Sequence, residues 1–377
     1  MVEAITNFHM LGALQGIVLA AALIMRRQNS LANRILGTWI LLLSFGLVSR
    51  FLMEHQFYLE YPHFTGADHS FPLLYGPLFY LYVRTLISPR PSFGRQQLLH
   101  FLPFLLHQVY FVPSFYAQSG SFKLQFMQSM MEQGPPVFIQ VSALLKVLHG
   151  STYVSLTLLL LRTHARSVCD SFSNIEKVSL HWLYVLAGLQ VVIWGTALVV
   201  NVVEFFGIYL LPAGLIYVMV AVMVYATGYF ALRQPEIFAT TAGQAAEPMA
   251  ATKYEKTRLD EDKAQQYLQE LIDHMKEEKP FMRSTLTLQE LADELSIASH
   301  QLSQVINDRL QKNFFDFINS YRVEEVQVRL LAPEAQNLTI LAVALDSGFS
   351  SKSSFFSVFK KFTSLTPTRY KSKHLSN

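Results

Sequence analysis

The sequence predicts an all-α protein: a seven-span transmembrane helical bundle followed by a cytoplasmic double helix-turn-helix domain. Three observations lead to this fold class. Hydrophobic residues make up 51% of the 377 residues and charged residues only 15%, whereas about 25% charged is typical of soluble domains. The long apolar runs all lie before Arg233. After them, one helical pattern occurs twice, beginning at Thr287 and again at Thr339.

Seven apolar runs in residues 1–233 are long enough to cross about 30 Å of hydrocarbon as helices. They cover residues 5–25, 35–53, 71–87, 98–116, 137–161, 180–203 and 208–230. Prolines interrupt the third and fourth runs, at Pro72, Pro77 and Pro103. Without one of these two spans the count would fall to six, and the two chain ends would lie on the same side of the membrane instead of on opposite sides. The charges of the connections therefore have to decide the topology.

The connections between the runs differ in charge. Three alternate connections carry eight cations, which are Arg26, Arg27, Arg34, Arg90, Arg95, Arg162, Arg166 and Lys177. The other three carry only Lys123. Arg50, near the outer end of the second run, goes against this pattern, but its long side chain can snorkel to the interface. Because loops rich in Lys and Arg stay in the cytoplasm, we expect a multi-pass bacterial inner-membrane protein with its first residues outside and its C-terminal part in the cytoplasm.

The motifs that usually indicate an enzyme are missing from the sequence. The apolar runs contain no paired carboxylates, and the chain has no HExxH, GxSxG or GxxxxGK motif. A single cysteine, Cys169, leaves no internal disulfide and no zinc framework. We therefore expect neither an enzymatic activity nor a cofactor.

The composition changes after residue 233. Residues 234–253 are small and polar without apolar periodicity, so they predict a flexible linker. Residues 254–280 are rich in charged helix formers, and Leu271 and Met275 belong to a single apolar stripe that ends before Pro280. The expected parts are a transmembrane domain over 1–233, the linker over 234–253, a charged amphipathic connector helix over 254–280 and a DNA-binding domain over 281–374.

The first repeated pattern reads TLQELADELSI, from Thr287 to Ile297. Thr287 and Glu290 have the spacing of a capping box, which marks the start of a helix. After a short turn, a second helix is expected to bury Leu302, Val305 and Ile306. Its outward side chains would then be Ser299, His300, Ser303, Gln304 and Asn307. Two short helices around a tight turn predict a helix-turn-helix unit.

The second pattern reads TILAVALDSGF, from Thr339 to Phe349, and repeats the first with one more residue in its turn. Gly348 supplies a flexible corner, and Ser351 is placed to cap the next helix. That helix is expected to bury Phe355, Val358, Phe359 and Phe362, and its outward side chains would be Lys352, Ser353, Phe356, Ser357, Lys360 and Lys361. Residues 314–331 predict a helix that fixes the spacing of the two units.

Short polar and basic side chains on a helix of about a dozen residues fit the major groove of B-DNA. Amides of Gln and Asn pair with adenine edges, while His and Lys donate to guanine acceptors. We assign base readout to Ser299, His300, Ser303, Gln304, Asn307, Lys352, Ser353, Phe356 and Ser357. Phosphate contacts, which give affinity without sequence information, are assigned to Lys360, Lys361, Arg369 and Lys371. Two joined helices of this kind would read groove segments about 34 Å apart.

The charge of the last residues agrees with a polyanionic partner. Residues 347–377 hold six Lys and Arg and no Asp or Glu. A solvated basic tail, or contact with anionic lipid, remains an alternative if charge alone is considered. The repeated helical pattern favours DNA.

Residues 286–371 resemble the C-terminal double helix-turn-helix domain of the AraC/XylS family of transcriptional regulators. The similarity is strongest in GFSSKSSFFSVFKKFTSLTPTRYK, at Gly348, Phe349, Ser351, Phe355, Phe359, Lys360, Pro367 and Tyr370. Arg322 also matches the helix that links the two units. With the multi-span region before it, the resemblance implies a membrane-bound family member that binds specific DNA and controls transcription. Ser364, Val326 and Ala298 depart from the glycine, alanine and Ser or Thr that the family pattern has there.

The membrane part is expected to be a sensor, because an anchor needs only one span. The outer loop over residues 54–70 holds Glu54, His55, His63 and His69, and imidazole with carboxylate suits transition metals. The alternative is that acids and histidines only fill the polar positions of this loop, so no metal is required. Lys146, His149 and His107 lie within apolar runs, where ionisable groups usually face a cavity or a neighbouring helix.

The expected partners are double-stranded DNA and the lipid bilayer. Further candidate partners are RNA polymerase, a second copy of the chain in a homodimer, and an unidentified small-molecule or ion signal. The competing hypothesis is a membrane receptor or transporter whose cytoplasmic helical domain binds a protein. A transporter would be expected to show an internal repeat among its spans, and none is evident in the sequence.

Overall fold

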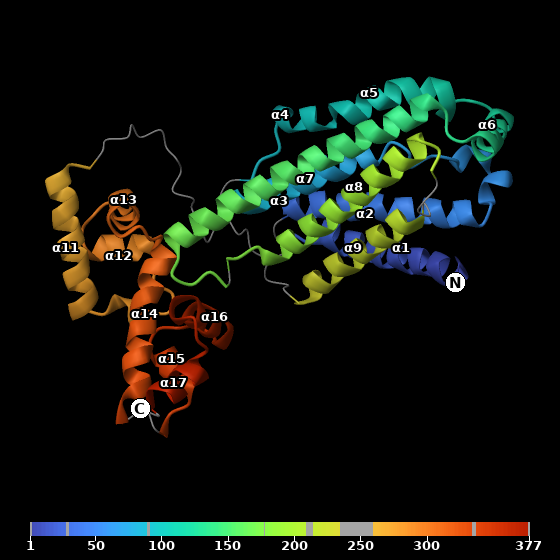
Figure 1. Cartoon of the computed structure of the whole chain (residues 1–377). Helices are drawn as coiled ribbons and strands as arrows, with labels where there is room; N and C mark the ends of the chain where they lie inside the picture. The colour runs from blue at the N-terminus through green and yellow to red at the C-terminus, as the bar shows by residue number, and fades with distance from the viewer. Residues whose placement is uncertain are drawn as a thin grey trace. The chain divides into compact units, whose positions relative to one another are not determined.

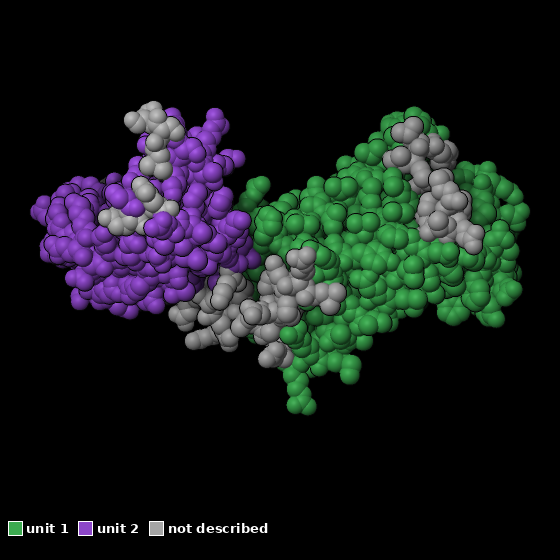
Figure 2. All heavy atoms as spheres, turned by 90° about the horizontal axis from the view of Figure 1, so that it is seen from below, with its two compact units in different colours: residues 1–162, 180–245 green, residues 163–179, 246–377 purple. Residues whose placement is uncertain are grey.

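The computed structural model of the chain describes residues 2–27, 30–88, 91–176, 178–208, 214–233, 259–333 and 337–375. The predicted linker over 234–253 lies outside the described residues. The described residues form helices and short 3-10 or π turns, with no strand among them, so the all-α expectation is confirmed for this part of the chain (Figure 1). The chain divides into two compact units: unit 1 comprises residues 1–162 and 180–245, and unit 2 residues 163–179 and 246–377 (Figure 2).

Unit 1 is a bundle of long apolar helices. Its helices are α1 (Val2–Met25), α2 (Ser30–Glu54), α3 (Pro72–Ile87), α4 (Arg95–Leu98), α5 (Leu102–Phe111), α6 (Gly120–Gln133), α7 (Val137–Ser171), α8 (His181–Phe205) and α9 (Gly214–Arg233). Short turns join them at η1 (Phe57–Leu59), η2 (Pro62–Phe64), η3 (Leu99–Phe101) and η4 (Val112–Tyr116). The last turns of α7, from Thr163 onward, belong to unit 2.

Six helices among the described residues are long and apolar enough to cross a membrane. They are Thr6–Met25, Ser30–Glu54, Arg95–Tyr116, Val137–Ser171, His181–Phe205 and Gly214–Ala231. The remaining predicted span, over 71–87, is α3, which has only 16 residues. Its length of about 24 Å falls short of the roughly 30 Å of a hydrocarbon core. The predicted count of seven spans is therefore not established, whereas six of the predicted runs form suitable helices.

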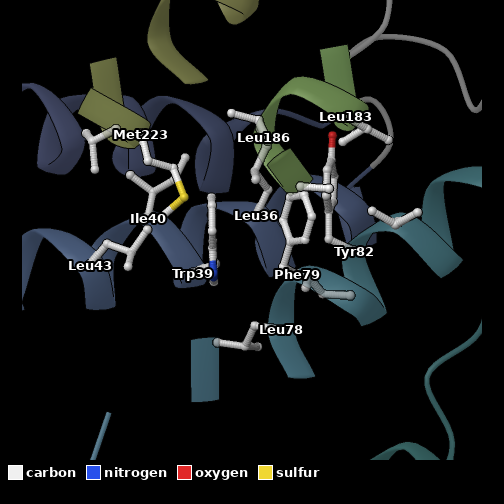
Figure 3. Packing of buried hydrophobic residues seen from close by; sticks show 14 of the residues in the cluster. Leu36, Trp39, Ile40, Leu43, Leu78, Phe79, Tyr82, Leu183, Leu186 and Met223 are labelled. Atoms are coloured by element: carbon white, nitrogen blue, oxygen red, sulfur yellow. The ribbon is translucent and has the colours of Figure 1, made fainter. Parts of the chain in front are cut away.

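α3 lies in the core of unit 1 despite its short length. Phe79 and Tyr82 of α3 are 1% exposed, and the ring of Phe79 lies 5.1 Å from that of Trp39 on α2. Leu183 and Leu186 of α8 complete this cluster (Figure 3). An interior position explains how a run interrupted by Pro77 can remain helical, because neighbouring helices surround the backbone.

Small residues let α1 and α2 approach closely. A Cβ atom on Gly37 of α2 would lie 2.7 Å from a side-chain carbon of Ile24 and 3.1 Å from the carbonyl oxygen of Ala20, both on α1. Contacts of this kind are common where helices pack in membranes, because small residues let backbones come together. The pair α1 and α2 is thus closely packed within unit 1.

Unit 2 consists of shorter helices built around α14. They are α11 (Glu261–Glu277), η5 (Pro280–Met282), α12 (Leu288–Glu294), α13 (Ser299–Leu310), α14 (Phe314–Leu331), α15 (Ile340–Asp346), α16 (Lys352–Thr363) and α17 (Pro367–Leu375). The first half of α14 packs Phe317 and Ile318 against α11, α12 and α13. The second half packs Val326 and Leu330 against α15, α16 and α17. One helix therefore supports two small cores.

Candidate nucleic-acid interface

The first helix-turn-helix unit consists of α12 and α13. The Thr287 hydroxyl accepts from the Glu290 amide at 3.2 Å, and the Glu290 carboxylate accepts from the Thr287 amide at 2.8 Å, which is the predicted capping box. Leu302, Val305 and Ile306 are buried, as expected for the inner face of α13. Ala298 stands at the N-cap of α13 and gives it no side-chain hydrogen bond.

In the second unit, a side chain caps the N-terminus of each helix, α15 and α16. Thr339 accepts from the Ala342 amide at 3.1 Å, and Ser351 accepts from the Ser354 amide at 3.1 Å. Gly348 has φ 92°, and a Cβ atom there would collide with the Phe281 carbonyl oxygen, so the corner requires glycine. Of the four residues predicted to face inward, Phe355, Val358 and Phe359 are buried, whereas Phe362 is only partly buried at the edge of the same cluster.

The two second helices present most of the predicted readout residues to solvent. On α13, His300 and Asn307 are exposed, while Ser299, Ser303 and Gln304 are half-buried. On α16, Lys352, Ser353 and Ser357 are exposed, and Phe356 is half-buried beneath the Lys352 ammonium, 5.7 Å from the ring centre. Gln304 also lines a cavity of about 360 Å³ with residues of the α11 end, among them Glu261. His300 and Asn307 on α13 and Lys352 on α16 are therefore exposed candidates for base contacts, and the Asn307 amide also donates to the Ser303 hydroxyl at 3.3 Å.

The four predicted phosphate contacts differ in their surroundings. Lys360 and Arg369 are exposed, and Lys371 is half-buried. Lys361 donates to the Asp316 carboxylate of α14 at 2.6 Å. A DNA phosphate at Lys361 would have to compete with the Asp316 carboxylate. The sequence did not suggest this contact between Lys361 and Asp316.

Arg322 of α14 ties the segment before α12 and the connection after α7 to α14. Its side chain is 1% exposed and donates to the carbonyl oxygens of Phe281 and Arg283, at 2.7 Å each. It also donates to the Ser173 carbonyl at 3.1 Å, the Ser173 hydroxyl at 3.0 Å and the Asn319 amide oxygen at 3.3 Å. Burial lowers the pKa of Arg322 to about 10, so the guanidinium stays charged at neutral pH. A residue that the sequence linked to the family pattern is thus a structural centre rather than a DNA contact.

The last turns of α7 and the residues that follow it, together residues 163–179, form part of unit 2. We call residues 172–179 the α7–α8 loop. Phe172 makes an isolated antiparallel bridge with Thr287, and Ser173 donates from its amide to the Leu286 carbonyl at 3.2 Å. The Glu176 carboxylate accepts from the Ser351 hydroxyl at 2.6 Å and from the Ser353 hydroxyl. No local pattern in the sequence indicates these contacts, because the paired residues are more than 100 positions apart.

α11, the predicted connector helix, packs directly on the first unit. Leu271 and Met275 are 0% exposed and lie in the same core as α12 and α13. Arg309 of α13 pairs with Glu261 at 2.7 Å, and His274 contacts Glu294 of α12 at 3.0 Å. Within unit 2, α11 is therefore an integral helix of the domain core.

The predicted metal ligands are not gathered into a site. Glu54 accepts from Arg50 at 2.8 Å and from Thr6 at 2.9 Å, and the His55 ring contacts the Phe51 carbonyl at 2.9 Å. Within the described ranges, which include Glu54, His55, His63 and His69, no group of three His, Cys, Asp or Glu residues is placed to hold a metal ion. Glu54, His55 and His69 have other contacts instead.

Lys146 and His107 make contacts between elements, whereas neither ring nitrogen of His149 has a hydrogen-bond partner and its ring lies against Tyr153 of the same helix. The Lys146 ammonium lies 2.8 Å from the Nε2 atom of His69. The His107 ring contacts the hydroxyls of Ser70 at 2.9 Å and Ser142 at 3.1 Å. The structure thus brings residues from α5, α7 and the α2–α3 connection into one polar cluster.

Comparisons with known proteins match the C-terminal part of the chain. Residues 291–373 match the family described as a helix-turn-helix domain. Relatives from Staphylococcus aureus strains COL and MSSA476, both described as uncharacterized HTH-type transcriptional regulators, are 32% identical over 113 residues, which is 30% of this chain. The chain spans only 14% of the length of these curated relatives.

A solved structure of a protein of unknown function from Listeria innocua is 26% identical to this chain. The match covers 28% of this chain and 94% of that one, with a TM-score of 0.25. Taken with the geometry of α12 to α16, the family match shows that the chain carries a helix-turn-helix domain in its C-terminal part, where it is similar to HTH-type transcriptional regulators.

Proposed function

We propose that this protein is a membrane-embedded, one-component transcriptional regulator that binds specific DNA through α13 and α16. The observation that carries the proposal is the pair of helix-turn-helix units fixed on a single helix, α14. Because both second helices are anchored to α14, they move as one body, and DNA would meet them at a constant spacing.

The chemistry of the outward faces supports DNA over a protein partner. α16 carries Lys352, Lys360 and Lys361 and no acidic residue, and Ser353 and Ser357 lie between Lys352 and the lysine pair. α13 offers Asn307 and His300, side chains that match the donor and acceptor pattern of base edges. An apolar hot spot, which a protein partner would need, is missing from the exposed residues of these two helices.

The apolar helices of unit 1 support a membrane location for the regulator. If α3 crosses with the six longer helices, an odd number of spans and the distribution of Lys and Arg place unit 2 in the cytoplasm, where DNA is found. RNA polymerase and a second copy of the chain are the further partners that we propose for transcriptional control.

The proposal is tested with the full chain in lipid nanodiscs and a pool of random DNA duplexes. The protein is expected to enrich one motif with two half-sites about one helical turn apart. Lys352→Glu should abolish the enrichment, whereas Lys276→Glu, the same change at an exposed position of α11, should preserve it. If no motif is enriched by a folded protein, the DNA-binding proposal is wrong and the protein-binding alternative becomes the better hypothesis.

A further inference from the structure

The first inference concerns a cavity at the end of unit 1 where α6 lies (Figure 1). It has a volume of about 400 Å³, within the range of small-molecule sites. Phe111 of α5, Phe126 of α6 and Phe138 of α7 supply aromatic walls, and Met127 and Met130 add flexible thioethers. An occupant would therefore need an apolar body.

One side of this cavity is polar. Asp68 accepts from the Ser49 hydroxyl at 2.6 Å, and His69 contacts Lys146 at 2.8 Å. Asp68 and His69 also line a second cavity of about 280 Å³ that reaches between α3, α7, α8 and α9. Burial, together with nearby Lys146 and His107, lowers the pKa of His69 to about 3, so its ring is neutral and can accept from Lys146. The two cavities thus share a polar cluster.

Each cavity contains a buried polar atom without a hydrogen-bond partner. The Thr65 hydroxyl lines the first cavity and is 5% exposed, and the Gln190 side-chain nitrogen lines the second and is 3% exposed. A buried group of this kind costs about 1–3 kcal/mol when unpaired. A bound molecule with a hydrogen-bonding group would remove that cost.

The charges of the cluster determine which head group fits. The charged groups already have partners: Asp68 accepts from Ser49 at 2.6 Å, Lys146 lies 2.8 Å from the His69 ring, and Arg50 is paired with Glu54 at 2.8 Å. A charged head group would be buried without a counter-ion, which is strongly unfavourable. We propose that this cavity binds a lipophilic small molecule with an uncharged, hydrogen-bonding head group, and that this molecule is the signal of the proposed regulator. The binding claim stands apart from the proposed function, while the claim that the molecule is a signal rests on it.

Photo-crosslinking tests the binding claim without DNA. The probe is a decanol that carries a diazirine in its chain, added to the full-length protein in phosphatidylcholine nanodiscs, and the labelled peptides are identified by mass spectrometry. Labelling is expected in the peptides of α5 and α6 that contain Phe111 and Met127. Unlabelled decanol should compete, whereas decanoate and decylammonium at equal membrane concentration should not.

Two variants and one matched control locate the probe. Met127→Trp fills the cavity, and Thr65→Val removes the unpartnered hydroxyl without changing the side-chain shape; each should lower labelling by about tenfold, which corresponds to about 1.4 kcal/mol. Val109→Trp adds the same ring to a side chain of α5 that is 75% exposed, and should leave labelling unchanged. Labelling spread over lipid-facing helices, or equal competition by the charged compounds, overturns the proposal. If the protein binds DNA but fails this labelling test, the proposed function stands and only the proposed ligand is wrong.

A second, independent observation concerns the α7–α8 loop in unit 2. Ser173 is 1% exposed, and its carbonyl accepts from Arg322 and from Asn319, each at 3.1 Å. Its hydroxyl donates to the Leu286 carbonyl at 2.6 Å. Without this loop, the buried Arg322 would lose two of its acceptors. The loop is therefore built into the domain that carries the candidate DNA interface.

The same loop places the carboxylate of Glu176 at the start of α16, the second helix of the second unit. The Glu176 carboxylate accepts from Ser351, which is the N-cap of α16, and from Ser353, a predicted readout residue. A helix N-terminus and its hydroxyls are also a favourable position for a DNA phosphate. Glu176 and a phosphate need the same donors, so both cannot be bound there at once.

The geometry points to Glu176 as an intramolecular competitor of DNA. The loop continues directly from α7 and leads into α8, so a change at the ends of these two helices reaches Glu176 through the covalent chain. Signal binding in unit 1 would favour DNA binding if it withdrew the loop, and would oppose it if it fixed the loop in place.

The test compares Glu176→Gln with Glu277→Gln in the full-length protein. Both remove one negative charge from an exposed position of unit 2, but no hydrogen bond to α16 involves Glu277. Glu176→Gln is expected to tighten binding to the selected DNA by about tenfold, or about 1.4 kcal/mol, and Glu277→Gln by much less. The melting temperature of both variants is measured so that a folding defect is recognised. Equal affinity of the two variants for DNA overturns the proposal.

Discussion

At the scale of single residues, the structure separates side chains that the sequence places in one class. Lys360 and Lys361 are adjacent on α16, but only Lys361 is paired with Asp316. Gln304 and Asn307 share α13, but Gln304 lies against the cavity beside α11. Lys360, which lacks the contact with Asp316, and Asn307, which does not line this cavity, are therefore the better residues for testing the predicted roles.

Lys360→Ala is expected to weaken binding to all DNA sequences alike and to lower the slope of log affinity against log salt by about 1, because a phosphate contact is lost. Lys361→Ala should have a smaller effect, since Lys361 is already paired with Asp316 and contributes less to a phosphate contact. Fluorescence anisotropy at several salt concentrations measures both values. An equal loss for the two variants would contradict the role of Asp316.

Asn307→Ala should instead reduce the preference for one base pair by about 1–3 kcal/mol, because an amide that reads a base edge is removed. Binding to non-specific DNA should change little, which distinguishes readout from phosphate contact. Competition assays with every single-base variant of the selected site would show the position. A uniform loss on all duplexes would remove Asn307 from the readout set.

Arg322→Lys is expected to destabilise unit 2 by about 3 kcal/mol, because the ammonium has three donors for the five hydrogen bonds that the guanidinium makes and buried acceptors are left unpaired. Denaturant unfolding of the full chain, followed by a probe in unit 2, measures this change. Arg369→Lys, a matched change at an exposed arginine, should alter stability by less than about 0.5 kcal/mol.

At the scale of helices, caps differ between the two units. Serine or threonine caps α12, α15 and α16, whereas α13 begins after Ala298 with no side-chain cap. Ser364 also departs from the family pattern, and it takes φ 59° at the C-cap of α16, a left-handed conformation that glycine adopts with less strain. Both departures therefore fall at helix ends, where their cost is local.

Ala298→Ser should stabilise the first unit by about 1 kcal/mol, because the new hydroxyl can accept one of the free amide hydrogens at the start of α13. Backbone hydrogen exchange in α13 reports the change directly, and Ala332→Ser, after the end of α14, serves as the control. Slower exchange confined to α13 is the expected result. Equal exchange rates in the two variants would show that the amide hydrogens at the start of α13 already have hydrogen-bond acceptors.

At the scale of the whole molecule, the proposed function requires unit 2 to face the cytoplasm. A reporter that is active only in the cytoplasm, fused after Asn377, should be active, and one that is active only in the periplasm should not. The same reporters fused between α2 and α3 should give the opposite result. If α3 does not cross the membrane, the two chain ends lie on the same side, and activity of only the periplasmic reporter after Asn377 would exclude a cytoplasmic DNA interface.

The local patterns of the sequence determined the helices and their class. Apolar runs, a capping box at Thr287 and the spacing of Phe355, Val358 and Phe359 depend on residues a few positions apart, so the helical content and both helix-turn-helix units were predictable. The same holds for most outward residues of α13 and α16. The prolines in residues 71–87 indicated that α3 is short, but no pattern in the sequence predicted that it lies in the core of unit 1.

The tertiary structure alone decided which distant residues meet. Ser173 and Asn319 are 146 positions apart, and Lys146 and His69 are 77 apart, so no periodicity connects either pair. The position of the α7–α8 loop in the helix-turn-helix domain and the polar cavity of unit 1 both depend on such contacts. The physical reason is that helix formation follows from neighbours along the chain, whereas a buried arginine or an apolar cavity takes its partners from whichever segments pack around it.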